Sequence, residues 1–145
     1  MFTATARSVG GTLRHEVDVN GRHTIITDEP ECLGGGDAGP APHELMAAML
    51  AACASTMIVL YAQRREWRLG DVRVDVRYDA DATPRRAEID VRLPEWLTPD
   101  QVERLRRVAN TCPARRALEA GFMFGEQLNL DLPLSIPPVK EALTS

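Results

Sequence analysis

Apolar and polar residues alternate near the start of the chain, and the pattern predicts a β-hairpin. Leu13, Val17 and Val19 fall on one face of a strand, and the charged residues Arg14, Glu16 and Asp18 fall on the other face. Asn20-Gly21 follows, and this pair is favoured in the tight turn of a hairpin, where both residues need a positive φ. Residues 22–27 are therefore expected to form the return strand.

The alternation ends at residue 28, and glycine and proline are frequent from there to residue 42. Loops of this length in compact domains are commonly functional. The end of the loop prepares a helix, because Pro42 suits the first helical position and the charge of Glu44 complements a helix N-terminus.

Residues 45–62 contain no charged residue, glycine or proline, and they predict an apolar helix about 27 Å long. That length approaches a membrane span. Six of the eighteen residues are alanine, Ser55 and Thr56 are polar, and no second span follows, so we expect no membrane insertion. A helix that is apolar on all sides has to be buried on all sides. One chain of 145 residues has limited material for this, so a partner chain is expected.

Strict alternation returns in the second half of the chain. Residues 72–78 and 87–93 alternate between apolar and charged, which predicts two antiparallel strands with one face in water. Thr98 and Gln101 have the spacing of a capping box, and the amphipathic helix that they open should end near Asn110.

A short helix is expected to begin at Cys112-Pro113 and to end at Gly121, since proline suits a first turn and glycine a helix end. Residues 122–132, with leucine at every second position towards their end, are expected to form a last strand. The resulting order, ββ-α-ββ-αα-β, belongs to the α+β class.

Length and composition describe an ordinary globular domain. The chain of 145 residues has the size of one domain, expected to span residues 1–145, with a loosely ordered Pro-containing tail at 133–145. A net charge of -4 and 5% aromatic residues argue against binding to nucleic acid or to an anionic membrane. The first residues lack the features of a signal peptide, so a cytoplasmic location is expected.

Three cysteines are the first candidates for chemistry. Cys53 lies in the middle of the apolar helix, where free cysteine commonly packs as a small hydrophobic residue and its thiol pKa rises. To be reactive, it needs a cation or a hydrogen-bond donor from another segment. Cys112 lies at a helix start, where backbone N–H groups, Arg115 and Arg116 favour a thiolate, although a purely capping role is the alternative. Cys32, in the glycine-rich loop, is interpreted as incidental.

The sequence predicts neither a metal nor a bound cofactor. Its three cysteines and three histidines do not have the spacing of a zinc site. It also contains no phosphate-binding loop, dinucleotide fingerprint or nucleophile elbow.

Three features together resemble the OsmC/Ohr family of thiol-dependent proteins that handle hydroperoxides. They are Asp28-Glu29-Pro30 followed by paired glycines, Pro42-His43-Glu44-Leu45 leading to Cys53, and Cys112-Pro113 at the start of a short helix. The resemblance spans residues 12–132. It implies an OsmC-like fold in an intertwined homodimer, with long central helices between β-sheets and two sites at the subunit interface.

The resemblance also implies a function. Cys53 would be the peroxidatic cysteine that reduces an organic hydroperoxide in oxidative-stress defence, and Cys112 would be the resolving cysteine. An external dithiol of the lipoyl or thioredoxin type would restore the thiols without a bound cofactor. Apolar neighbours such as Met46, Met49 and Ile58 suit an organic peroxide better than hydrogen peroxide.

The chain departs from the family pattern at two activating positions. Peroxidases of the family use an arginine from the N-terminal hairpin and a glutamate ten residues before the cysteine. His43 occupies the glutamate position, with Glu44 beside it, and Thr12 occupies the arginine position, with Arg14 and Arg22 as the remaining candidates. The alternative is therefore a non-enzymatic dimer that binds a hydrophobic small molecule at its interface, with both cysteines structural.

Overall fold

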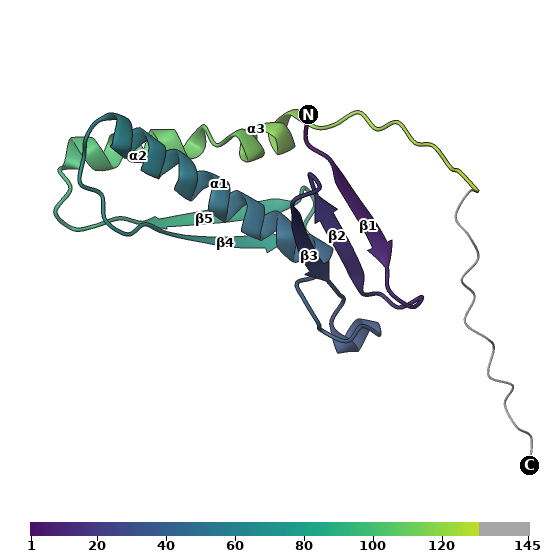
Figure 1. Cartoon of the computed structure of the whole chain (residues 1–145). Coiled ribbons are helices and arrows are strands. Elements are labelled where there is room, and N and C mark those ends of the chain that lie inside the picture. Colours follow the sequence, from purple (N-terminus) through teal and green to yellow (C-terminus); the bar gives the residue numbers. More distant parts are fainter. Residues whose placement is uncertain (131–145) are drawn as a thin grey trace, which may run out of the picture.

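A computed structural model describes residues 1–130, and its first three strands form one antiparallel sheet. These strands are β1 (Ala4–Ser8), β2 (His15–Val19) and β3 (His23–Thr27), in the spatial order β1-β2-β3 (Figure 1). The predicted turn between β2 and β3 is confirmed, because Asn20 and Gly21 have φ angles of 54° and 64°.

Asp28 organises the loop that follows β3. Its side chain is buried, and its carboxylate accepts hydrogen bonds from the backbone N–H groups of Glu29, Gly36 and Ala38 at 2.9, 3.1 and 3.3 Å. Burial acts to raise the pKa of Asp28, but these three donors, with a smaller contribution from Arg14, lower the pKa below its usual value. The loop, which includes the 3₁₀ turn η1 (Glu31–Leu33), is thus a structured segment.

Two glycines of this loop lie against neighbouring backbone. A Cβ atom at Gly35 would overlap the carbonyl oxygen of Glu29, and one at Gly39 would overlap the carbonyl oxygen of Ile26. The close approach explains why these positions carry no side chain.

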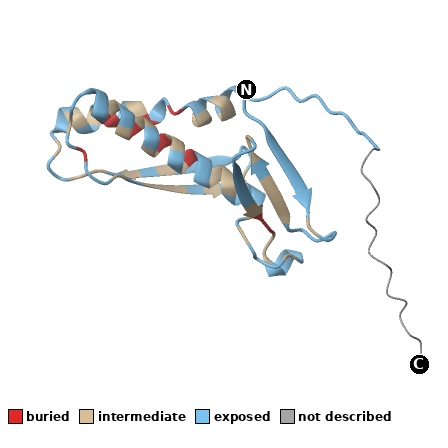
Figure 2. Cartoon of the chain, viewed as in Figure 1, coloured by how far each residue is buried: buried red, intermediate tan, exposed pale blue. Residues whose placement is uncertain are grey.

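Helix α1 (Pro42–Arg64) is the central element of the chain. Pro42 occupies the predicted first position, and Glu44 accepts a hydrogen bond from the Ala41 N–H at 2.9 Å. One stripe of α1 is buried against the rest of the chain (Figure 2), and its members are Leu50, Ala54, Ile58 and Ala62.

Strands β4 (Arg73–Asp79) and β5 (Arg86–Arg92) form a second antiparallel sheet, which lies along α1 (Figure 1). Val74 and Val91 face each other across the pair and pack against the core around Ile58. The outer face carries ion pairs instead, among them Arg73–Asp75 and Arg77–Glu88.

Helices α2 (Pro99–Asn110) and α3 (Pro113–Ala120) complete the described fold. The capping box at Thr98 and Gln101 is confirmed, with both reciprocal hydrogen bonds present. Leu105 of α2 is fully buried and belongs to the same core as Ile58 and Ala62 of α1.

The α+β class is confirmed, but the predicted order of elements is wrong at both ends. The structure has a strand, β1, that was not predicted from the sequence: Ala4 and Ala6 alternate with Thr5 and Arg7, but alanine is a weak apolar signal, and the strand is held by its pairing with β2. Residues 122–130 form no strand and are exposed, and the last two residues of the predicted strand lie outside the described residues. A strand needs a neighbouring backbone to pair with, and no described strand pairs with this segment. The predicted tail at 133–145 also lies outside the described residues.

Residues 1–130 bury only one face of helix α1. Met49 and Leu60 on the opposite face remain 41% and 40% exposed. By length and composition alone, α1 is the one helix of residues 1–130 that could cross a membrane, with a mean hydropathy of 2.0 over 18 residues. Its buried stripe and its packing on β4 and α2 identify it as the core helix of the fold.

Candidate active site at Cys53 and Cys112

Helices α1 and α3 bring Cys53 and Cys112 together, although the two residues are 59 positions apart in the sequence. Cys112 is the N-cap residue of α3 and is fully buried. Cys53 is half-buried on α1, and its thiol interacts with the Cys112 side chain and with the backbone N–H of Ala114. Both cysteines have free thiols in this structure.

The surroundings of Cys53 oppose ionisation. Burial raises the pKa of the Cys53 thiol, and the neighbouring Cys112 side chain raises it further, while the Ala114 N–H lowers it in part. Within residues 1–130 no cationic side chain is among the groups that perturb this pKa. The described chain alone therefore does not activate Cys53.

Cys53 lies at the border between two faces of α1. It follows Leu50 of the buried stripe by about one helical turn and lies about 100° around the helix from Ala54. The exposed side chains of Met49 and Leu60 lie on the same side of the buried stripe as Cys53. A surface that covered these two side chains would also close over Cys53.

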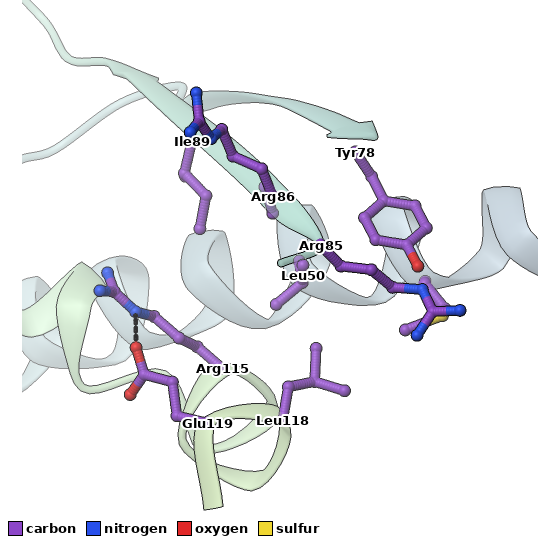
Figure 3. Close-up of a pocket in the computed structure, with 10 residues that line it drawn as sticks. Leu50, Tyr78, Arg85, Arg86, Ile89, Arg115, Leu118 and Glu119 are labelled. Atoms are coloured by element: carbon purple, nitrogen blue, oxygen red, sulfur yellow. Dashed lines mark hydrogen bonds and ion pairs between the residues drawn. The ribbon is translucent and has the colours of Figure 1, made fainter. Parts of the chain in front are cut away.

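A cavity of about 590 Å³ lies between α1, the β4–β5 hairpin and α3, and neither Cys53 nor Cys112 lines it. Leu50 lines it one turn before Cys53, and Arg115 lines it one turn after Cys112. Figure 3 shows Arg85 and Tyr78 at one end of the cavity and the ion pair of Arg115 with Glu119, 2.7 Å long, at the other. The remaining lining residues are Met46, Arg86, Ala87, Ile89 and Leu118.

Glu44 and His43, the two candidate activating residues near the start of α1, make contacts with groups other than Cys53. Glu44 caps the helix through its bond to the Ala41 N–H. The ring of His43 lies 6.2 Å from the ring of Tyr78, between centroids. Neither residue is among the groups that perturb the Cys53 pKa.

The two arginine candidates lie in turns of the N-terminal sheet. Arg14 is exposed just before β2, and it acts on the pKa of Asp28. Arg22 is exposed in the turn between β2 and β3. Thr12 donates its hydroxyl to the Val9 carbonyl at 2.7 Å. The described chain does not bring these residues to Cys53.

Cys32 is exposed on η1, away from the other two cysteines. Among residues 1–130, no group of three histidine, cysteine, aspartate or glutamate side chains could hold a metal ion. The expectation that the chain binds no metal or cofactor stays a prediction.

The arginines that line the cavity and the structural role of Asp28 were not predicted from the sequence. Arg85 and Arg86 directly follow the predicted turn between two alternating strands. Two adjacent arginines at that position were the sequence feature that could have drawn attention to them. Asp28 was quoted only as part of a motif, whereas its side chain in fact holds the loop together.

Comparisons with known proteins agree on one family. The family model for OsmC-like proteins matches residues 34–124. A comparison with curated proteins finds no match.

Solved structures with the same fold include two at 27% identity. A protein of Psychrobacter arcticus 273-4, named for osmotic stress induction and detoxification response, has a TM-score of 0.68 over 80% of this chain and 87% of that chain. The organic hydroperoxide resistance protein OsmC of Legionella pneumophila has a TM-score of 0.59 over 81% and 88%. An OsmC-like protein of Mycoplasma pneumoniae, 16% identical, shares the fold with a TM-score of 0.67 over 82% and 87%.

The family model covers well over half of the chain, and these structures share its fold over four fifths of the chain. The chain therefore belongs to the OsmC/Ohr family.

Proposed function

We propose that this protein is a thiol-dependent peroxidase that reduces organic hydroperoxides, with Cys53 as the peroxidatic and Cys112 as the resolving cysteine. The observation that carries the proposal is the contact between these two free thiols, which come from separate helices. The hydroperoxide-resistance name of the Legionella pneumophila relative, at 27% identity, supports the same chemistry.

The reaction proceeds in three balanced steps. The Cys53 thiolate attacks the distal oxygen of the hydroperoxide, the O–O bond breaks, and the alkoxide takes a proton and leaves as an alcohol. Cys53 is then a sulfenic acid. The Cys112 sulfur attacks the Cys53 sulfur, and water leaves as the disulfide forms. An external dithiol reduces this disulfide by exchange and is itself oxidised; a lipoyl or thioredoxin type suits this step.

The working unit is a homodimer in this proposal. Within residues 1–130, Met49 and Leu60 give α1 an uncovered apolar face, and residues 122–130 expose apolar side chains without pairing to a described strand. A second copy would cover both. The second copy would also supply the positive charge that Cys53 lacks, with Arg14 and Arg22 as the candidate residues. The proposed location of this homodimer is the cytoplasm.

Rapid mixing with cumene hydroperoxide tests the proposal. Wild type should lose two thiols per chain and form the Cys53–Cys112 disulfide. Cys112→Ser should stop at a sulfenic acid, and Cys53→Ser should not react. Cys32→Ser is the matched control and should behave as wild type, because Cys32 is exposed on a separate loop. If Cys53 reacts no faster than a free thiol at equal pH, the proposed peroxidase function is excluded.

A second candidate is a dimer that binds a hydrophobic small molecule and uses both cysteines only for packing. The raised pKa of Cys53 favours it, because a protonated thiol is a poor nucleophile. The same mixing experiment separates the two functions, since the binding protein would keep both thiols.

A further inference from the structure

The first turn of α3 has a backbone donor that the helix itself does not use. A helix leaves its first N–H groups without an acceptor inside the helix. Pro113, at the first position of α3, has no N–H group, and the side chain of the N-cap residue Cys112 makes no capping hydrogen bond. The N–H of Arg116 is bonded to the Cys112 carbonyl at 3.0 Å. The N–H of Ala114 is therefore the first donor of α3, and it precedes the helical hydrogen bonds.

The sulfur of Cys53, on α1, meets this donor. Within residues 1–130, the Ala114 N–H and the Cys112 side chain are the two groups that act on the Cys53 thiol. A side chain from another helix thus takes the place that the N-cap side chain usually fills. The N-terminus of a helix carries a partial positive charge, which favours a thiolate at this position.

The arginines of the same turn do not have this role. Arg115 donates to the Asn110 side chain at 2.9 Å and forms an ion pair with Glu119 at 2.7 Å. Neither Arg115 nor Arg116 is among the groups of residues 1–130 that perturb the pKa of Cys53. The contribution of α3 to Cys53 comes from its backbone and not from its cationic side chains.

We propose that the backbone N–H of Ala114 activates Cys53, by donating a hydrogen bond that stabilises the thiolate beside the resolving Cys112. Loss of the thiol proton leaves a negative charge on the sulfur, and a hydrogen bond to a charged group is stronger than one to a neutral group. The inference rests on the proposed peroxidase and divides its activation between two sources. The hydrogen bond comes from this chain's own α3, and the positive charge comes from the second copy.

Ala114→Pro tests the donor, because it removes the N–H and proline is tolerated in the first turn of a helix. Alkylation of Cys53 by iodoacetamide is followed across pH by mass spectrometry. Its midpoint should rise by about one pH unit, as expected when one hydrogen bond to a charged group is lost. Ala114→Gly keeps the N–H and is the matched control, with a midpoint at the wild-type pH. Equal midpoints in the two variants would overturn the inference.

A second proline also restrains Pro113, so an ester at the same position is the second test. Lactic acid in place of Ala114 exchanges only the N–H for an oxygen atom, and it should raise the midpoint as the proline does. Lactic acid in place of Ala117 removes an N–H that bonds within the helix instead, and it should leave the midpoint unchanged. A rise at both positions, or at neither, would contradict the proposed donor.

Alkylation needs no hydroperoxide, so it separates this inference from the proposed function. If cumene hydroperoxide does not oxidise Cys53 but Ala114→Pro raises the midpoint, the donor stands and the peroxidase fails. If wild type reduces the hydroperoxide and the midpoint does not move, the donor alone fails. If both stand, Ala114→Pro should slow sulfenic acid formation in Cys112→Ser about threefold at neutral pH. The thiolate fraction falls about tenfold, while the remaining thiolate is more nucleophilic. An unchanged rate would count against the donor.

Discussion

The surroundings of Cys53 favour the protonated form of its thiol. Burial and the neighbouring Cys112 side chain both favour the neutral form, against a single backbone N–H from Ala114. The proximity of the two sulfurs that suits disulfide formation therefore also delays the first step. The balance between these effects can be measured on single residues.

Cys112→Ala should lower the pKa of Cys53, because it removes one of the groups that raise it. The rate of Cys53 alkylation by iodoacetamide increases as the thiol ionises, so its midpoint should move to lower pH than in wild type. Mass spectrometry of the peptide that contains Cys53 gives this rate separately from the other cysteines. Cys32→Ala should leave the midpoint in place, and a midpoint at equal or higher pH in Cys112→Ala would contradict the argument.

Asp28→Asn should destabilise the protein at neutral pH, because an amide cannot accept three N–H donors as a carboxylate does. The folded pKa of Asp28 lies below its usual value of 3.8. Its contribution is thus fully present above that value and is lost as the pH falls through the lowered folded pKa. Urea unfolding midpoints of wild type and variant should differ at pH 7 and converge in acid. A constant difference across this range would show that the carboxylate charge is not the cause.

At the scale of elements, local chemistry explains what the sequence predicted and what it did not. The Asn20-Gly21 turn, the cap at Thr98 and the apolar helix follow from neighbouring residues, and each is present. Strand β1 depends on its pairing with β2, because the alternation of Ala4 and Ala6 with polar residues is only a weak strand signal. Residues 122–130 have the alternation of a strand but no partner in the described chain.

The candidate site also has a part that could be predicted from the sequence and a part that could not. The cysteine pair was predicted through the family resemblance, and α1 and α3 do bring the two thiols together. The cavity could not be predicted, since its lining comes from two helices and a hairpin that are distant in the sequence. Only the packing of the hairpin on α1 places Arg85 and Leu50 around one space.

Gly39→Ala should destabilise the loop after β3 by about 1–3 kcal/mol, because the new methyl group would overlap the carbonyl of Ile26. Thermal unfolding should show a lower Tm. Gly125→Ala is the matched control, since a Cβ atom there meets nothing within 4 Å. An equal Tm for both variants would mean that the loop accommodates the added methyl group without a loss of stability.

At the scale of the whole molecule, residues 1–130 leave apolar surface uncovered on α1 and on the segment 122–130. Met49 and Leu60 lie on one side of the helix, and Phe124 and Leu130 are almost fully exposed. Exposed apolar surface of this extent is typical of an interface. The homodimer proposed above would bury it.

Met49→Glu/Leu60→Glu should convert the dimer into monomers, because it places two charges in the proposed interface. Analytical ultracentrifugation at micromolar concentration should give the mass of two chains for wild type and of one chain for the variant. Leu33→Glu is the control, because Leu33 is exposed on η1 and away from α1, and it should sediment as wild type. A wild-type protein that sediments as a monomer would refute the homodimer.

The absence of charge from residues 45–62 of α1 has a consequence for how the sequence can vary. One face of the helix packs on the chain's own core, the opposite face is apolar and uncovered, and Cys53 lies at the border between them. Between residues 45 and 62, no position would then tolerate a lysine or glutamate. In a library of single substitutions, this segment should be as intolerant of charge as a protein interior. The outer face of the β4–β5 hairpin, covered with paired charges, should accept nearly any polar residue.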